Sequence, residues 1–360
     1  MLKKKVIPQI KTLLYKDRWI YLLCSALTLI VSIIAYSFEQ SNHIDLLAYY
    51  NKFLIAAALT LLIYSIGYFI YLICQLHPRP ISQYINQVRK VSVEQIIRAV
   101  VMMFFLSLVL SSYTTLKSLI PLIHPYTNGL DNELIQLDRW LHFGRDPWEI
   151  THTLFSSIEA SSFINLMYNL WFFIVWVVAF YFLISIKSEK LRQQYLISFV
   201  LCWVVNGGFI AVGLSSVGPC FYHLINGGND YFQPLMNLLN EKNQQLIDNG
   251  SGITLWALKT QVTLWESYLK GGFHLGSGIS ACPSMHVSMA TLMAIGMTKK
   301  NKWWGLIFWP YCLIIIIGSV HLGWHYAIDG YLSILLTTII WKSVHYAMNS
   351  TKKTYQLNPA

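Results

Sequence analysis

The chain has 360 residues, of which 55% are hydrophobic, 15% aromatic and only 12% charged, and its mean hydropathy is +0.47. Charged residues make up about 25% of a typical soluble domain, so the composition excludes an ordinary soluble fold and indicates a polytopic membrane protein. The formal net charge is +10, and its meaning depends on where the basic residues lie along the chain.

Apolar runs long enough to cross a bilayer recur along the chain. A spanning helix needs about 20 mainly apolar residues, and such runs lie at 19–38, 53–76, 96–120, 164–186, 195–216, 285–298, 304–320 and 326–348. We therefore expect an all-α polytopic protein with about eight transmembrane helices. Seven or nine are alternative counts, because the run at 285–298 is short. The first run is too long for a removed signal peptide.

The distribution of charge orients these spans. With eight spans, most of the 26 Lys and Arg residues fall on the side that holds the N-terminus, and most of the 16 Asp and Glu residues fall on the other side. Basic loops remain in the cytoplasm, so we expect both termini there, in a bacterial inner (plasma) membrane. The net charge then reflects topology and implies no nucleic-acid partner.

Two long loops fall on the non-cytoplasmic side, at 121–163 and 217–284. In the first loop, Asp146-Pro147 precedes apolar residues and is typical of a helix start. The apolar residues that follow suit a helix lying in the membrane interface. In the second loop, glycine breaks separate amphipathic segments. We expect both loops to supply interfacial helices that cover the outer face of the protein.

The residues with the clearest chemistry lie at the outer ends of two late spans. His286 ends the segment CPSMH, and His325 and Asp329 lie in HLGWHYAID. Ionisable groups at membrane depth are costly and usually functional. Asp329 is one helical turn after His325, so its carboxylate can hold one imidazole tautomer and stabilise the imidazole cation. A structural histidine and a structural ion pair are the alternatives.

His321 shares a helical face with His325, which raises the alternative of a metal site that includes Asp329. No further ligand has suitable spacing, so we expect no metal and no cofactor. Cys220 and Cys282 each lie beside a proline in an outer loop. In an oxidising compartment these two cysteines can form a disulfide, and two free thiols are the alternative.

The two histidine segments resemble motifs of the type 2 phosphatidic acid phosphatase superfamily. PSMH at 283–286 is similar to its second motif, PSGH, and HYAID at 325–329 is similar to the end of its third, SRxxxxxHxxxD. The resemblance covers roughly 115–345. It implies a six-helix phosphatase-like core at 96–348, preceded by a two-span N-terminal addition at 1–95 and followed by a cytoplasmic tail at 349–360.

Three basic positions of the family pattern are not basic in this chain. Ser319 stands where the third motif has arginine. The first motif, KxxxxxxRP, matches only at Pro219, with Ala211 and Gly218 in place of its two cations. The inositol phosphorylceramide synthase-like (inositolphosphotransferase-like) branch similarly lacks the arginine of the third motif. Residues 137–148 are also similar to a D-x-x-L-x-F-G-x-x-P segment of its bacterial members, so the chain resembles this branch most.

The resemblance implies a role for each of these residues. His325 attacks phosphorus to form a phosphohistidine, Asp329 orients it, and His286 protonates the leaving alcohol; water or a second alcohol then takes up the phosphoryl group. Phosphoryl transfer also needs charge neutralisation. We favour Lys117 and Arg139 as the cations, with Ser284 and Ser319 and the helix start at Ser284 as further phosphate-binding groups. A surface or snorkelling role is the alternative for either cation.

We therefore expect an enzyme whose partner is a lipid phosphate or phospholipid in the outer leaflet. The missing cations and the synthase-like motifs favour a phosphotransferase that moves a phospho-head group. A lipid phosphate phosphatase, of the phosphatidate or polyprenyl phosphate type, is the alternative. A non-enzymatic transporter is disfavoured, because transporters concentrate ionisable groups near the bilayer midplane. The sequence indicates neither the head group nor the oligomeric state.

Overall fold

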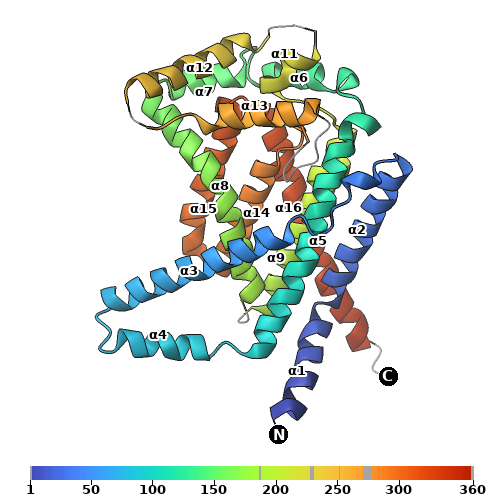
Figure 1. Cartoon of the computed structure of the whole chain (residues 1–360), viewed down its shortest axis with the longest axis vertical. Helices are drawn as coiled ribbons and strands as arrows, with labels where there is room; N and C mark the ends of the chain where they lie inside the picture. The colour runs from blue at the N-terminus through green and yellow to red at the C-terminus, as the bar shows by residue number, and fades with distance from the viewer. Residues whose placement is uncertain (1, 186–187, 228–230, 251, 271–277, 358–360) are drawn as a thin grey trace.

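The computed structural model describes residues 2–185, 188–227, 231–250, 252–270 and 278–357, with the backbone alone for 2–6 and 351–357. Within these ranges the regular structure is helical and contains no strand. The chain is therefore an all-α polytopic membrane protein, as its composition predicts. Figure 1 shows a bundle of long helices with a layer of shorter helices across one end and both termini at the other.

Seven helices of the described residues are long and apolar enough to cross a membrane. Each corresponds to one of the eight predicted runs. They are α2 (Arg18–Ser37), α3 (Tyr50–Cys74), α5 (Val93–Ile123), α8 (Ile158–Ile184), the segment Glu189–Gly213, α15 (Lys302–His321) and α16 (Ala327–Leu357). The segment Glu189–Gly213 is built from α9 (Glu189–Leu201), the π-helical η3 (Cys202–Ile210) and α10 (Ala211–Gly213).

The eighth predicted run forms α14 (Met285–Lys300), which packs against α15 and α16 and is largely buried. Its 16 residues make it about 24 Å long at 1.5 Å per residue, which is less than the roughly 30 Å hydrocarbon core. Lys299 and Lys300 end the helix at the side of the termini. We infer that its first residues, including His286, lie below the opposite membrane surface.

Capping side chains set the starts of several spans. Ser92 begins α5 in a capping box with Gln95, and Ser157 accepts the amide hydrogen of Ala160 at the start of α8. Asn301 ends α14 and begins α15, where its side chain accepts the amide hydrogen of Trp303. Such caps satisfy amides that have no partner inside the helix. They explain why the helices begin a few residues outside the apolar runs.

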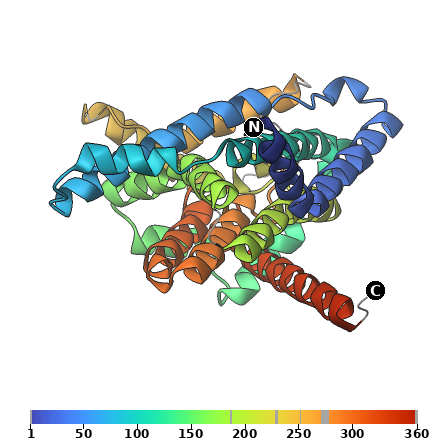
Figure 2. The same ribbon diagram turned by 90° about the horizontal axis from the view of Figure 1, so that it is seen from below.

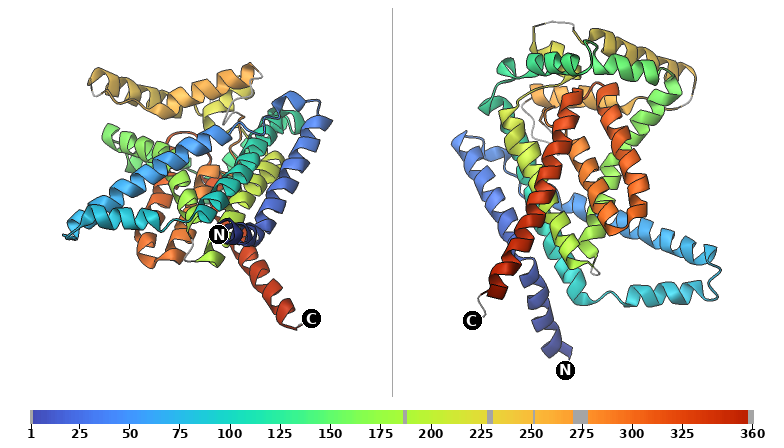
Figure 3. Two further views of the ribbon diagram at one scale, coloured as in Figure 1. Left: turned by 60° about the horizontal axis from the view of Figure 1, so that its bottom comes forward. Right: turned by 180° about the vertical axis from the view of Figure 1, so that it is seen from behind.

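A layer that we call the cap lies at the end of the bundle away from the termini (Figures 1 and 3). The predicted helix start at Asp146-Pro147 is confirmed, with Asp146 at the N-cap and Pro147 in the first turn. The cap comprises α6 (Asp131–Leu141), α7 (Pro147–Leu154), α11 (Tyr222–Ile225), α12 (Gln233–Asp248) and α13 (Trp256–Leu269), with the single turns η2 (Tyr126–Asn128) and η4 (Pro219–Phe221).

The N-terminal helices lie along one side of the bundle (Figure 2). α2 packs against α5, whereas α3 buries few of its side chains and presents an apolar surface suited to lipid. The remaining elements here are α1 (Leu2–Lys16), the turn η1 (Ser41–His43) and α4 (Pro80–Arg89). We propose that 1–95 is an addition to a core at 96–348; α16 carries the start of the proposed tail at 349–360 as helix to Leu357.

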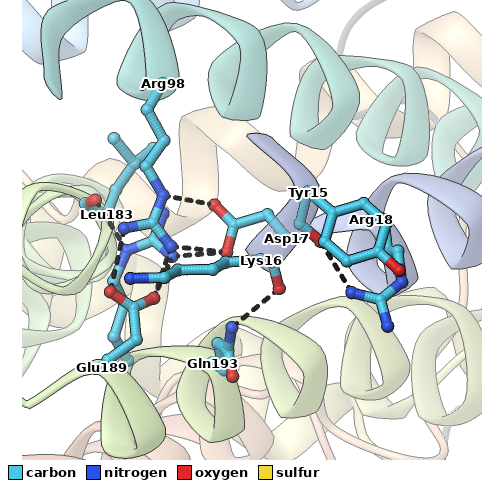
Figure 4. A network of polar contacts seen from close by, with 9 residues as sticks. Tyr15, Lys16, Asp17, Arg18, Arg98, Leu183, Glu189 and Gln193 are labelled. Atoms are coloured by element: carbon cyan, nitrogen blue, oxygen red, sulfur yellow. Dashed lines mark hydrogen bonds and ion pairs between the residues drawn. The ribbon is translucent and has the colours of Figure 1, made fainter. Parts of the chain in front are cut away.

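A buried ion-pair network links the N-terminal segment to the core near the end that holds the termini (Figure 4). Asp17, between α1 and α2, accepts hydrogen bonds of 2.7 and 2.8 Å from Arg98 of α5 and one of 2.8 Å from Arg192 of α9. Glu189 also pairs with both arginines. Asp17 is fully buried, and Glu189 is 31% exposed. The N-terminal segment is thus joined to the core by charge as well as by packing.

Close packing of η3 against α5 and α14 gives a first prediction. A Cβ atom on Gly207 would lie 2.7 Å from the Tyr113 ring and 2.8 Å from Sδ of Met285. Because such overpacking strains a close-packed interior, Gly207→Ala should lower the free energy of unfolding by about 1–3 kcal/mol. Gly67→Ala is the matched control, since a Cβ there meets nothing within 4 Å. Thermal unfolding in detergent should separate the two variants, and equal midpoints would contradict the packing argument.

Candidate active site

The structure brings the two predicted histidines together. His286 lies in the first turn of α14, and His325 lies in the loop between α15 and α16. Their ring centroids are 6.5 Å apart. The loop is shaped by Ser319, whose carbonyl accepts the amide hydrogens of Trp324 and His325 at 3.0 Å each. The fold therefore places the two imidazoles in one site although they lie 39 residues apart in the chain.

His325 is held in one tautomer. Its Nδ1 lies 2.8 Å from the carbonyl oxygen of Ala281 and 3.4 Å from Oδ2 of Asp329. A carbonyl oxygen can only accept a hydrogen bond, so Nδ1 carries the proton and Nε2 has the free lone pair. Asp329 is fully buried, and its Oδ2 also accepts the amide hydrogen of Tyr326 at 3.0 Å. Nε2 of His325 is therefore the ring nitrogen whose lone pair is available for a nucleophilic role.

His286 is fixed by aromatic side chains of α8. Its ring stacks on Tyr168 at 4.4 Å and lies 4.2 Å from the Trp171 ring, whose Nε1 donates to the His286 carbonyl at 3.0 Å. Nε2 of His286 is buried and has no hydrogen-bond partner among the described residues. A buried nitrogen of this kind is costly unless a ligand satisfies it. Its position suits a proton donor to a bound substrate.

The two favoured cations have different surroundings. Lys117 of α5 packs against Gly278 and acts electrostatically on His286, and its ammonium has no ion pair or hydrogen bond within the described ranges. Arg139 of α6 instead pairs with Asp146 at 3.2 Å and donates to the Tyr231 hydroxyl at 3.1 Å. Lys117 is thus the cation that is free to meet a phosphoryl group.

Ser284 and Ser319 both have partners within the protein. The Ser284 hydroxyl caps α14 by accepting the amide hydrogen of Val287, and its own amide donates to the Asp329 carbonyl at 3.3 Å. The Ser319 hydroxyl donates to the Ile316 carbonyl at 2.7 Å. The Ser319 hydroxyl proton is thus bonded to the protein, whereas the Ser284 hydroxyl, among the described residues, only accepts and keeps its own proton to donate. Phosphate binding by these two residues stays a prediction.

The absence of a basic side chain at position 218 has a steric reason. Gly218 has φ +83°, and a Cβ there would lie 2.5 Å from the Trp324 carbonyl oxygen. The amides of Val217 and Gly218 donate to the carboxylate of Asp131 at 3.0–3.1 Å, and the Tyr326 hydroxyl donates to it at 2.8 Å. A carboxylate of the protein therefore occupies backbone amides that could otherwise bind an anion.

A second carboxylate of α6 occupies the start of α16. Asp138 accepts the amide hydrogens of Ala327 at 2.7 Å and Ile328 at 2.9 Å. The sequence interpretation did not assign Asp131 or Asp138 a role. Their spacing of seven residues, which places them on one helix face, and the segment 137–148 were the available signals. α6 thus lines the site with negative charge.

The ionisation of Asp138 gives a pH prediction. Burial raises its pKa to about 6, although the two amide hydrogen bonds oppose this. The carboxyl of Asp138 in the unfolded chain titrates near 3.9. The stability that protonated Asp138 contributes to the fold is therefore lost as the pH rises from about 4 through 6. Relative to Asp138→Asn, whose side chain can still cap α16, the wild type should lose about 3 kcal/mol between pH 4 and pH 7. Unfolding of both proteins across this range tests it; parallel curves would contradict it.

The structure corrects the disulfide hypothesis. Cys220 and Cys282 are both free and buried. Cys220 packs in a small cluster with Phe221 and Ile279, whereas Cys282 belongs to the main hydrophobic core. The two thiols are therefore enclosed in separate apolar environments and are not bonded to each other.

His321 lies in a cluster of polar and aromatic side chains that joins the cap to the bundle. Its Nε2 lies 2.9 Å from the Ser161 hydroxyl, and its ring stacks on His152 at 3.7 Å. Lys242 of α12 donates to Ser161 at 2.9 Å and lies 3.3 Å from Nδ1 of His152. Burial and the charge of Lys242 lower the pKa of His152 to about 4. The cluster links the cap to α8 and α15.

A model of the PAP2 superfamily matches residues 132–342, which is more than half of the chain. No curated protein and no solved structure matches the chain. The matched range contains His286, His325 and Asp329, whereas Lys117 lies outside it. The chain therefore belongs to the PAP2 superfamily and is a phosphatase or phosphotransferase of the PAP2-like type.

Proposed function

We propose that the protein is a lipid phosphotransferase of the inositol phosphorylceramide synthase-like branch, which moves a phospho-head group at the outer leaflet. The observation that carries this proposal is the geometry of His325. Its Nδ1 is bonded to the Ala281 carbonyl beside Asp329, and its free Nε2 shares the site with the unpartnered Nε2 of His286. This pairing of a nucleophile with a proton donor suits covalent phosphoryl transfer.

The reaction has two steps. Nε2 of His325 attacks phosphorus, and a P–N bond forms as the P–O bond to the lipid alcohol breaks; His286 gives its proton to the leaving oxygen. The acceptor alcohol then attacks phosphorus, the P–N bond breaks, and the alcohol proton passes to His286. The phosphorylated imidazole is cationic while Nδ1 keeps its proton, so Asp329 stabilises the intermediate.

Charge favours a phosphodiester over a phosphomonoester as the substrate. Asp131, Asp138 and Asp329 are buried in the loops and helix ends around the site, and each hydrogen-bonds to backbone amides of the 217–218 or 326–328 segments. A phosphomonoester dianion would be repelled more strongly by these carboxylates than a phosphodiester monoanion. This supports transfer of a head group over hydrolysis of phosphatidate.

Both termini are proposed to be cytoplasmic, in a bacterial inner membrane, with the site on the opposite side. The basic loops of the sequence support this orientation. The cap and the termini lie at opposite ends of the bundle, which agrees with it (Figure 3).

Lys117 is proposed to neutralise the phosphoryl oxygens. Lys117→Gln should lower kcat/KM about 10- to 100-fold, since a charge-assisted hydrogen bond contributes about 1.5–3 kcal/mol. Lys259→Gln is the matched control, because Lys259 is an exposed lysine of the cap helix α13. Head-group release by both variants is the measurement, and equal activity would remove Lys117 from the mechanism.

The proposed function is tested with purified protein and head-group-labelled phospholipids in EDTA, with and without candidate acceptor alcohols. The label should appear on the acceptor and, transiently, on the protein as an acid-labile phosphohistidine. Inorganic phosphate from phosphatidate as the only product would establish a phosphatase instead. Inactivation by EDTA would indicate a metal-dependent reaction.

A further inference from the structure

The helix α4 connects the spans α3 and α5 at the end of the bundle that holds the termini (Figure 1). It runs across the direction of the long helices, and the cap lies at the opposite end of the bundle. Its 10 residues make it about 15 Å long, which is too short to cross a bilayer. A short helix between two consecutive spans belongs at the membrane surface, here on the side away from the candidate site.

One face of α4 is apolar and exposed. Ile81, Ile85 and Val88 lie four and three residues apart, so they form a strip along the helix. All three side chains are exposed, whereas the Tyr84 ring beside them lies against two aromatic rings of α3. An exposed apolar strip on a helix at the membrane surface is suited to contact with the acyl chains of lipids.

An open hollow runs along the border between this strip and a polar strip. The polar strip is formed by Ser82, Asn86 and Arg89, which have the same spacing as the apolar residues. The hollow is lined by residues of both strips and by Arg79 and Pro80 at the helix start. Its volume is about 490 Å³, within the range of about 300–1,000 Å³ that is usual for ligand sites. A lipid head group can therefore occupy it while the acyl chains follow the apolar strip.

The charge around the hollow is positive. Arg79 precedes α4, Arg89 ends it, and Lys90 follows directly. Both arginines are exposed, and within the described part of the chain neither guanidinium has an ion pair or a hydrogen bond. The sequence contains no acidic residue between Asp45 and Glu94. Guanidinium groups bind phosphate oxygens well, because their N–H donors match the geometry of the anion. The hollow thus presents unpaired cations beside an apolar strip.

We propose that the hollow on α4 binds the head group of an anionic phospholipid in the leaflet on the side of the termini. Arg79 and Arg89 attract the phosphate from the two ends of the hollow, and Ser82 and Asn86 hydrogen-bond to the head group. A zwitterionic lipid is disfavoured, because residues 46–93 offer no carboxylate to pair with its ammonium group. The bound lipid is separate from the substrate, and the inference involves no residue of the candidate active site.

The test measures lipid binding to the purified full-length protein by native mass spectrometry in a non-ionic detergent. The probes are phosphatidylglycerol and phosphatidylcholine with the same acyl chains. The double variant Arg79→Gln, Arg89→Gln should bind phosphatidylglycerol about 10- to 30-fold more weakly at one site, as expected for the loss of two basic residues near an anionic head group. Its binding of phosphatidylcholine should not change. A lipid in the candidate active site is common to both proteins, so the difference reports on α4. Unchanged binding of phosphatidylglycerol would overturn the proposal, and an equal loss for both lipids would overturn the preference for an anionic head group.

Two further variants separate a specific site from general attraction. Lys299→Gln, Lys302→Gln removes two exposed positive charges at the same end of the bundle, outside α4, and should change binding less than about twofold. Asn86→Trp fills the hollow without changing the charge, and Asn and Trp have similar helix propensities. It should weaken the binding of phosphatidylglycerol about as much as the arginine variant. Equal losses in the lysine and arginine variants would show that only net charge matters, and unchanged binding by Asn86→Trp would show that the hollow is not the site; either result would contradict the proposal.

Discussion

Replacing His325 by alanine should lower kcat by at least about a thousandfold, because the variant cannot form the covalent intermediate. The side chain is 7% exposed, and among the described residues its polar partners are the Ala281 carbonyl and Asp329. We therefore expect the helices to stay in place when this side chain is removed. Diacylglycerol release measures the loss, and thermal unfolding shows that the variant is folded. Full activity of His325→Ala would end the proposed mechanism.

A comparison with His286→Ala separates the two histidine roles. If His286 protonates the leaving alcohol, its loss should cost about 10²- to 10⁴-fold with a phospholipid. The loss should largely disappear with a p-nitrophenyl phosphodiester, whose leaving group needs no proton. His325→Ala should stay inactive with both substrates. His223→Ala is the control within the cap, at a part-exposed histidine of α11. Rescue of both variants, or of neither, would contradict the assigned roles.

The long helices could be predicted because a spanning segment must be apolar over its whole length, whatever its neighbours are. α14 shows the limit of this rule. Its apolar run is short because the helix is enclosed by α15 and α16 and begins below the surface at Ser284. Length alone could not decide whether such a run is a span.

The catalytic pair could be recognised because its two motifs carry residues that are rare at membrane depth. The surroundings of the pair could not be predicted, because they depend on how the outer loops fold back. Asp131 and Asp138 bond to amides 86 and 189 residues away along the chain. Arg139 was favoured as a phosphate ligand, yet it pairs with Asp146 of the same loop. The number of charged residues in the outer loops does not indicate which of them bond to each other or to backbone amides.

Contacts between distant segments were also not predictable at the end of the bundle that holds the termini. In the sequence, Arg98 and Arg192 are basic residues of loops that orient the spans. In the structure both are buried and bonded to Asp17, which lies 81 residues from Arg98 and 175 residues from Arg192 along the chain. Asp17 itself precedes the first span as an isolated acidic residue. The charge pattern was informative only about orientation, and it could not reveal that these residues hold the N-terminal helices to the core.

Asp17→Ala should destabilise the protein by about 3–5 kcal/mol, because it leaves two buried guanidinium groups without their shared carboxylate. Glu189 is part exposed and can compensate only in part. Burial alone would raise the pKa of Asp17, but the hydrogen bonds from Arg98 and Arg192 outweigh it and lower the pKa. The contribution of Asp17 is therefore present above its ordinary pKa and is lost as the pH falls through the lowered value. Thermal unfolding in detergent at neutral pH measures the effect.

Two further variants show whether charge or packing is responsible. Asp45→Ala removes an exposed carboxylate from the same N-terminal segment and should change the stability by less than about 1 kcal/mol. The triple variant Asp17→Leu, Arg98→Met and Arg192→Met replaces the network by apolar side chains and should recover much of the loss, since a buried network is costly chiefly when one partner is missing. If the triple variant is less stable than Asp17→Ala, the network contributes net stability and the desolvation argument fails. If it recovers, the arginines are not retained for stability, and a role of their charge in orienting the spans becomes the explanation to test.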